Sequence, residues 1–195
     1  MPWQTTVLRL LREKVRLVLD HLHQDYILVD VGNVGRSERQ DFADNPLMSV
    51  PVLKHGEHML LDSDHIASYL VRSFDPADRF DVLTSDAKTL NARAILNGAM
   101  AAEVRLVLAA RSGLETTAVP FFDKSRSVIR HALDWCEAEH SFFAPLSKSY
   151  AQFHFISFWD HVHHYGLIEG RWPHLQTIAD ELAEDALIAR SSIPN

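Results

Sequence analysis

The residues that most clearly suggest chemistry surround a proline, at Val50-Pro51. Residues 50–54 and 58–62 are short strand-forming runs joined by a turn that contains Gly56, so together they predict a β-hairpin. Proline cannot donate a hydrogen bond to a strand ladder, and its place at a strand entry needs an explanation. A cis Val50-Pro51 bond would leave the backbone of Val50 able to pair with the peptide backbone of a bound ligand. The alternative is a trans proline at an ordinary strand start.

A polar pair, Asp62-Ser63, comes directly after the hairpin. Either side chain can cap a helix that begins there. The apolar residues that follow recur at helical spacing and should face a sheet. They are Ile66, Tyr69, Leu70 and Phe74.

The only cysteine, Cys136, excludes an internal disulfide bond and suits a reducing compartment. It shares helical spacing with Val128, Ala132 and Trp135, which favours a buried structural thiol over a nucleophile.

Three histidines, His161, His163 and His164, lie close together near the end of a predicted helix. His161 and His164 share a face, but no histidine pair is four residues apart and no cysteine accompanies them, so we expect no metal site. Histidines near the carboxyl end of a helix also suit its macrodipole.

Composition narrows the class of protein. The chain has 195 residues, a formal net charge of −7 and no run of Lys or Arg, which argues against binding nucleic acid or a membrane surface. No apolar run approaches the roughly 20 residues of a spanning helix, and the amino terminus does not read as a signal peptide. We therefore expect a cytoplasmic protein of one large or two small domains.

The elements that must position these residues fall into two groups. Residues 3–11 predict a strand, and residues 26–31 predict a buried strand parallel to it. The segment between them predicts a helix, with Glu13 and Lys14 mostly outside and with an apolar inner face made by Val15, Val18, Leu19 and Leu22. A loop over residues 32–44, the hairpin and its helix complete a thioredoxin-like order.

The second group is helical and follows a break at residues 75–78. We expect helices over residues 85–111 and 119–139, a loop over 140–148, a helix opened by a capping box of Ser149 and Gln152, and a last helix from Trp172. On the first of these helices the inward residues should be Leu90, Ala94, Ala101, Val104 and Leu108. The expected domains are 1–75 and 85–195, with a linker over 76–84.

Several of these features, in this order, resemble glutathione S-transferases. They are Asn45-Pro46, Val50-Pro51-Val52-Leu53, Asp62-Ser63, Ile66, Tyr69-Leu70 and the capping box, where this chain has Gln152 in place of the family's Asp. The resemblance implies an α/β plus all-α fold: a thioredoxin-like domain with a mixed four-stranded sheet, followed by a helical bundle.

The resemblance also implies a binding site for glutathione as co-substrate. Asp62 would hold the ammonium of the γ-glutamyl end, Ser63 and the helix amides its carboxylate, and Val50 and Pro51 the cysteinyl backbone. A plain helix cap remains the alternative at Asp62-Ser63.

The family further implies a second substrate and a partner. The electrophile would lie near Met100, Glu103 and Arg105. A homodimer would form through the long helix and the helix before it. No metal is expected.

One position departs from the family. Where relatives carry the Ser, Tyr or Cys that stabilises the glutathione thiolate, an ungapped alignment of residues 14–19 places Arg9. Arg9 could stabilise the thiolate by its charge, or Thr5 or Thr6 could supply a hydroxyl. The third alternative is a silent protein that acts by binding or interaction. The resulting hypothesis is a detoxifying transferase that conjugates glutathione to a small hydrophobic electrophile; peroxidase or isomerase chemistry stays open.

Overall fold

A computed structural model describes residues 3–7, 13–31, 37–144 and 148–191, with residues 3–7 and Asp30 described by their backbone. The chain forms two compact units, residues 1–83 and residues 84–195. The boundary between them falls within the segment 76–84.

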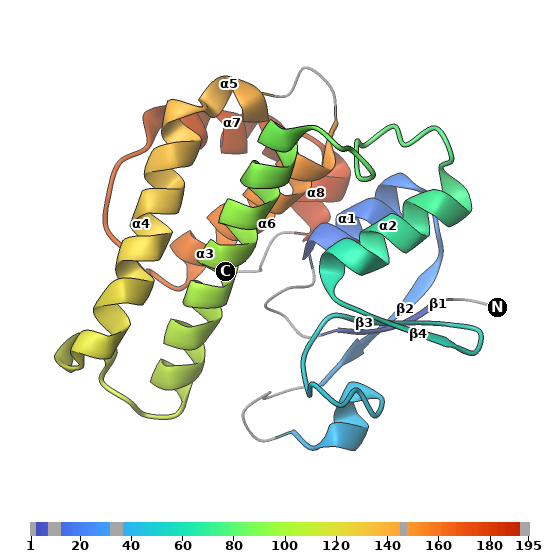
Figure 1. The fold of residues 1–195 in the computed structure, drawn as a ribbon, viewed down its shortest axis with the longest axis horizontal. Coiled ribbons are helices and arrows are strands. Elements are labelled where there is room, and N and C mark those ends of the chain that lie inside the picture. The colour runs from blue at the N-terminus through green and yellow to red at the C-terminus, as the bar shows by residue number, and fades with distance from the viewer. Residues whose placement is uncertain (1–2, 8–12, 32–36, 145–147, 192–195) are drawn as a thin grey trace. The chain divides into compact units, whose positions relative to one another are not determined.

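The first unit is built on a mixed sheet with the strand order β2-β1-β3-β4 (Figure 1). Its strands are β1 (Trp3–Val7), β2 (Tyr26–Asp30), β3 (Val52–His55) and β4 (His58–Leu61). β1 pairs in parallel with β2 and antiparallel with β3, which itself pairs antiparallel with β4. This arrangement, with two helices following β1 and β4, confirms the thioredoxin-like architecture.

Those two helices, α1 (Glu13–His21) and α2 (Ser63–Phe74), pack against each other. The predicted inward side of α1 is buried, whereas on α2 Tyr69 and Phe74 are only half-buried. Fully buried side chains on them are Val15, Leu17, Val18, Leu19, Ile66, Ala67, Leu70 and Val71. The loop between β2 and β3 contains only a short 3₁₀ turn, η1 (Arg39–Phe42), whose Phe42 is also fully buried.

Two expectations for this unit were wrong. β2 is an edge strand of the described sheet, so Ile27, Leu28 and Val29 are 37–44% exposed where a buried strand was predicted. Glu13 and Lys14 are buried, although the helix pattern put them outside. Apolar character alone does not separate a central strand from an edge strand.

The hairpin is confirmed. His55 pairs with His58 across a two-residue turn, and Val52 pairs with Leu61 at the other end. Gly56 takes the first turn position with φ of 59°, a conformation that favours glycine.

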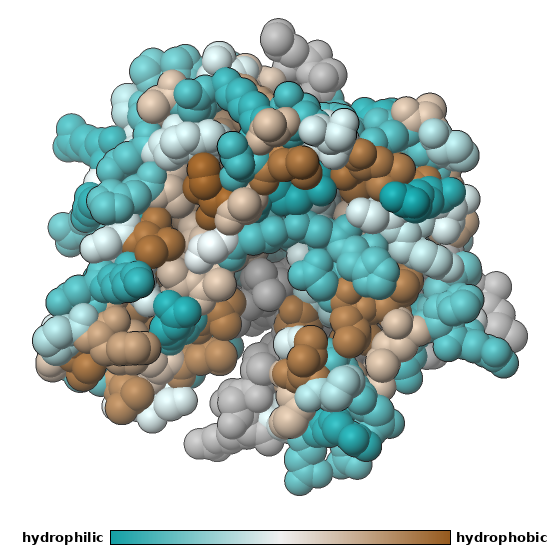
Figure 2. Space-filling model, viewed as in Figure 1, coloured by the Kyte–Doolittle hydropathy of each residue, from teal (hydrophilic) through white to brown (hydrophobic). Residues whose placement is uncertain are grey.

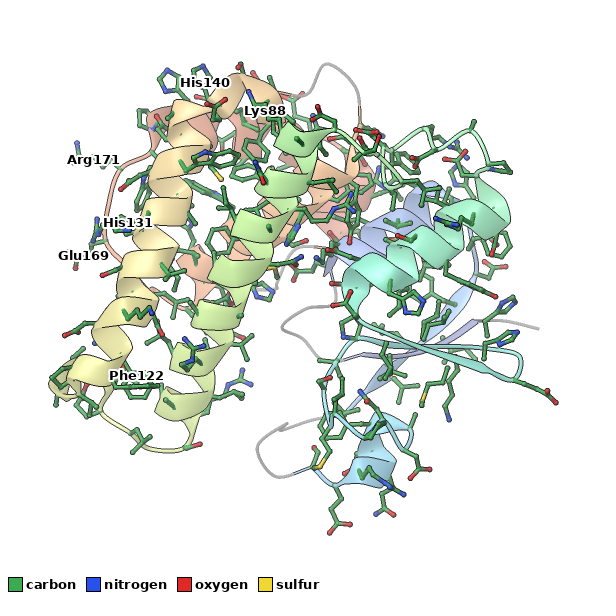
Figure 3. The ribbon with its side chains drawn as sticks, in the orientation of Figure 1. Lys88, Phe122, His131, His140, Glu169 and Arg171 are labelled. Carbon is green, nitrogen blue, oxygen red and sulfur yellow. The ribbon has the colours of Figure 1, made fainter. Side chains whose placement is uncertain are left out.

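The second unit is a bundle of helices (Figure 1). They are α3 (Ala87–Arg111), α4 (Asp123–Ala138), α5 (His140–Phe143), α6 (Tyr150–His164), α7 (Pro173–Ala183) and α8 (Ala186–Ser191), with 3₁₀ turns η2 (Thr116–Ala118) and η3 (Pro120–Phe122) between α3 and α4. α3 packs against α4 and α6. Side chains in Figure 3 show that α3 and α4 run in opposite directions, because Lys88 at the start of α3 and Phe122 just before α4 lie at opposite ends of the pair.

Helix boundaries differ from the prediction at three places. α4 begins at Asp123 rather than at 119, because Pro120 opens the separate turn η3. Residues 140–143 form α5 where a loop was expected, and the last predicted helix is followed by a second, α8.

The buried face of α3 is not the predicted one. Leu90 is 42% exposed, and Ala94 and Ala101 are exposed as well. The core side of the helix carries Thr89, Ala92, Leu96, Ala99, Met100, Ala102, Glu103, Leu106 and Val107. Alanines occur on both sides of α3, so their spacing does not mark the side that is buried.

The capping box of α6 is confirmed. The Gln152 amide donates to Ser149 Oγ (3.3 Å), and the Ser149 amide donates to Gln152 Oε1 (3.0 Å). α6 lies in the core of the unit, with most of its side chains buried. None of the described helices combines the length and the apolar character needed to cross a membrane.

Candidate functional site

The junction between β4 and α2 consists of one residue, Asp62. Its backbone has φ of 69°, and its Oδ1 accepts hydrogen bonds from the amides of Asp64 (2.9 Å) and His65 (3.1 Å). Asp62, rather than Ser63, is therefore the helix cap, and it satisfies two amides that the first turn leaves without partners.

The cap uses only one oxygen of the Asp62 carboxylate. Within the described part of the chain, Oδ2 of Asp62 takes part in no hydrogen bond, and the side chain is exposed. The same carboxylate can thus cap α2 and bind a cation at once. Ser63, beside it, is 6% exposed.

The segment that leads into β3 carries the cis Val50-Pro51 bond that the sequence predicts. Asn45 holds this segment: its Nδ2 donates to the carbonyl of Ser49 (2.8 Å), and its Oδ1 accepts from the amide of Leu47 (2.9 Å). Asn45 is fully buried. The sequence contained this signal only as the Asn45-Pro46 pair of the family resemblance.

A buried ion pair adjoins the start of α2, and sequence reasoning missed it. Lys14 Nζ, on α1, lies 2.9 Å from Asp64 Oδ1, with exposed side-chain fractions of 0% and 21%. Only Ser63 separates Asp64 from the cap at Asp62, so the pair ties α1 to the first turn of α2. Nothing in the helical spacing of α1 indicates it, because the partner is 50 residues away.

The structure describes only part of the region that carries the proposed thiol-activating residues. Arg9 lies outside the described residues. Thr6 lies on β1, where its backbone is opposite Val29 and Val52, and its neighbour Thr5 is opposite Leu28 and Leu53; the side chains of both are outside the description. The role of Arg9 or Thr6 stays a prediction.

This unit is similar to a known family of domains. Residues 12–78 match the model of the glutathione S-transferase N-terminal domain. The matched residues all lie within the first unit.

Solved glutathione S-transferases share the fold over nearly the whole chain. A family member from Pseudomonas fluorescens with bound glutathione has a TM-score of 0.85 at 18% identity, covering 99% of this chain and 100% of the other. An enzyme from Methylobacillus flagellatus with glutathione bound has a TM-score of 0.79 at 19% identity, covering 98% and 100%. A glutathione transferase from Phanerochaete chrysosporium with oxidised glutathione gives 0.78 at 16%, covering 97% and 92%. No curated protein sequence is similar enough to match.

In the helical unit, the three residues predicted to line an electrophile site have different surroundings. Met100 and Glu103 are buried, whereas Arg105 is exposed and donates from Nη1 to Ser125 Oγ on α4 (3.0 Å). Glu103 Oε1 instead lies 2.9 Å from His161 Nδ1 on α6. Burial raises the pKa of Glu103, and the hydrogen bond from His161 opposes that rise.

The remaining candidates, His163 and Cys136, have surroundings typical of structural side chains. His163 Nδ1 lies 2.9 Å from the Trp159 carbonyl. Among the described residues, no three His, Cys, Asp or Glu side chains are grouped as a metal site requires. Cys136 is 0% exposed, and burial raises the pKa of its thiol to about 12, which confirms it as a buried structural thiol.

Proposed function

We propose that this protein binds glutathione at the start of α2. The observation that carries the proposal is the divided Asp62 carboxylate: Oδ1 caps the helix, and Oδ2 is left for the ammonium of the γ-glutamyl group. Ser63 would hold the adjoining carboxylate at the start of the helix, where the helix dipole favours negative charge. Val50 and Pro51 would take the cysteinyl backbone. The match of residues 12–78 to the family's N-terminal domain supports this assignment.

The proposed reaction conjugates the glutathione thiol to a small hydrophobic electrophile. A thiol with a pKa near 8.5 is a few per cent ionised at neutral pH, and lowering that pKa by two units takes about 2.7 kcal/mol of thiolate stabilisation. Arg9, by charge, or Thr6, by its hydroxyl, is proposed to supply it. Met100, Glu103 and Arg105 stay the proposed positions for the electrophile. Detoxification in the cytoplasm is the role that this chemistry fits.

We further propose a homodimer that uses the outer face of α3. Leu90, Ala94 and Ala101 are exposed there. An open groove of about 510 Å³ lies beside them, and its lining includes Ile95 of α3 and Trp135 of α4. Figure 2 shows apolar surface between hydrophilic residues along α3 and α4 on the face in view. Small residues allow helices to approach closely. Sedimentation should give a dimer, and Ala94→Arg should shift it to monomer.

Two measurements on one preparation test the enzymatic proposal. Calorimetric titration with glutathione reports binding, and an assay with chlorodinitrobenzene, a general aromatic electrophile, reports conjugation. Binding with turnover supports the proposed transferase. Binding without turnover indicates a silent binding protein, and the absence of both rejects the glutathione site. Arg9→Ala separates the two activating groups, because loss of turnover with retained binding assigns the thiolate to Arg9.

A further inference from the structure

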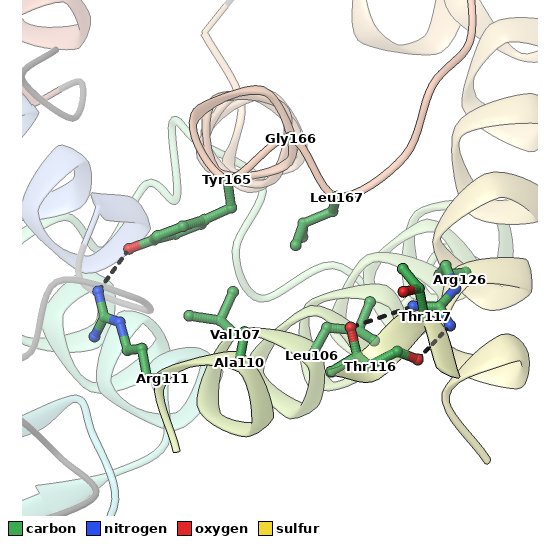
Figure 4. A pocket seen from close by; sticks show the side chains of 10 residues that line it. All are labelled: Leu106, Val107, Ala110, Arg111, Thr116, Thr117, Arg126, Tyr165, Gly166 and Leu167. Carbon is green, nitrogen blue, oxygen red and sulfur yellow. Dashed lines mark hydrogen bonds between the residues drawn. The ribbon is translucent and has the colours of Figure 1, made fainter. Parts of the chain in front are cut away.

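A second cavity lies entirely within the helical unit. It has a volume of about 280 Å³ and lies between the carboxyl-terminal half of α3, the end of α6 and the turn η2 (Figure 4). Its lining residues are Leu106, Val107, Ala110 and Arg111 of α3, Thr116 and Thr117 of η2, Arg126 of α4, and Tyr165, Gly166 and Leu167. Apolar side chains form its middle, and one arginine stands at each end (Figure 4).

The two arginines differ in how their charge is balanced. Arg126 Nη2 lies 3.1 Å from Asp123 Oδ1 and donates to the Thr116 carbonyl at 2.7 Å, so its charge is neutralised. Arg111 Nη2 donates to the Tyr165 hydroxyl at 3.2 Å, and its guanidinium lies 5.7 Å from the centre of the Tyr165 ring. Within the described residues, no carboxylate pairs with Arg111.

We propose that this cavity binds a small molecule with one carboxylate and an apolar body. The Arg111 guanidinium would take the carboxylate, because its planar fork of donors matches that group in a bidentate pair. The apolar body would lie over Val107, Ala110 and Leu167. The volume is near the roughly 300 Å³ lower end for ligand pockets, which selects a small acid.

The charge and the lining residues of the cavity argue against phosphate ligands and against fully apolar ligands. A phosphate or pyrophosphate carries more than one negative charge, and only one arginine of the cavity lacks an acidic partner among the described residues. A fully apolar ligand would gain nothing from Arg111. All lining residues belong to the helical unit, so this site goes beyond the glutathione site and does not depend on it.

The test compares phenylbutyrate with its neutral amide by calorimetry in buffer without glutathione. We expect the acid to bind about tenfold more tightly than the amide, since a charged hydrogen-bond pair replaces a neutral one. Arg111→Gln should remove that preference. Arg130→Gln, which removes an exposed arginine of α4 outside the cavity, should keep it.

A second variant tests the place of binding. Ala110→Leu fills the cavity from an exposed position of α3 and should abolish binding of both probes, whereas Ala183→Leu, at an exposed alanine of α7 outside the cavity, should leave binding unchanged. Circular dichroism verifies that each variant is folded. The proposal is overturned if phenylbutyrate does not bind, if Arg111→Gln keeps the preference for the acid, or if the folded Ala110→Leu protein still binds.

Discussion

Glu103 Oε1 lies 2.9 Å from His161 Nδ1, and the two side chains, from α3 and α6, have exposed fractions of 0% and 1%. This pair joins α3 to α6, which pack against each other, across 58 positions of sequence. Because burial raises the pKa of Glu103, the folded protein binds the proton of the Glu103 carboxyl group more tightly than the unfolded chain does.

The pH dependence of stability follows from that direction. The contribution of Glu103 is fully present below its ordinary pKa of 4.5 and is lost as the pH rises through the raised value. Glu103→Gln keeps an acceptor for His161 but does not titrate. Its free energy of unfolding should therefore rise relative to that of the unchanged protein as the pH increases above 4.5. Urea unfolding measures this, with the exposed Glu169→Gln as control; a constant difference would contradict the assignment.

Asp62 allows capping and binding to be separated. Asp62→Asn keeps a capping oxygen and tolerates a positive φ, so stability should change little. It removes the negative charge, and glutathione affinity should fall at least about tenfold, the equivalent of about 1.4 kcal/mol. Asp62→Ala should lose the same affinity and, in addition, about 1 kcal/mol of stability or more. Calorimetric titration and thermal unfolding of both variants check this; unchanged affinity in Asp62→Asn would leave Asp62 as a cap only.

Gln152 makes two hydrogen bonds in addition to its capping box. Its Nε2 donates to the carbonyls of Ala144 (2.8 Å) and Phe143 (3.3 Å), which a carboxylate cannot do. Gln152→Glu preserves the box but places a buried charge against these carbonyls. We expect a loss of about 2–3 kcal/mol at neutral pH, measured by urea unfolding, and a smaller loss in acid, where the side chain is protonated. A stability equal to that of the unchanged protein would show that the two carbonyls do not need a donor.

Cys136 should be inert in the folded protein. With a pKa of about 12 the thiolate is present at about one part in ten thousand at pH 8, and the side chain has no exposed surface. Labelling by a disulfide reagent should therefore be negligible in native buffer and complete in denaturant, as read from absorbance. Fast labelling of the native protein would mean that α4 opens readily.

Local signals in the sequence predicted much of the first unit and of its site. The hairpin around Gly56, the cis Val50-Pro51 bond and the polar cap after β4 each depend on residues close together in the chain, and each is confirmed. The capping box at Ser149 belongs to the same class. Such features follow from backbone chemistry that neighbouring residues control.

Features that depend on distant partners were not predictable in the same way. Lys14 has a charged side chain and a helical position that suggest exposure, and only Asp64, on another helix, makes its burial possible. The exposure of β2 depends on its place in the sheet, and the inward side of α3 depends on where α4 and α6 pack. Whether Met100, Glu103 and Arg105 share a surface could not be judged from spacing, since it depends on that same packing.

Because a single residue connects β4 to α2, the backbone at the start of this helix has little conformational freedom. The position of β4 in the hairpin therefore determines the orientation of the first turn of α2. The hydrogen bonds from the Asp64 and His65 amides to Asp62 stabilise that orientation. A ligand that binds there meets groups already in place, so little conformational entropy is lost on binding. If this connection were one residue longer, the binding groups at the start of α2 would no longer be preorganised, and each ligand would have to order them on binding.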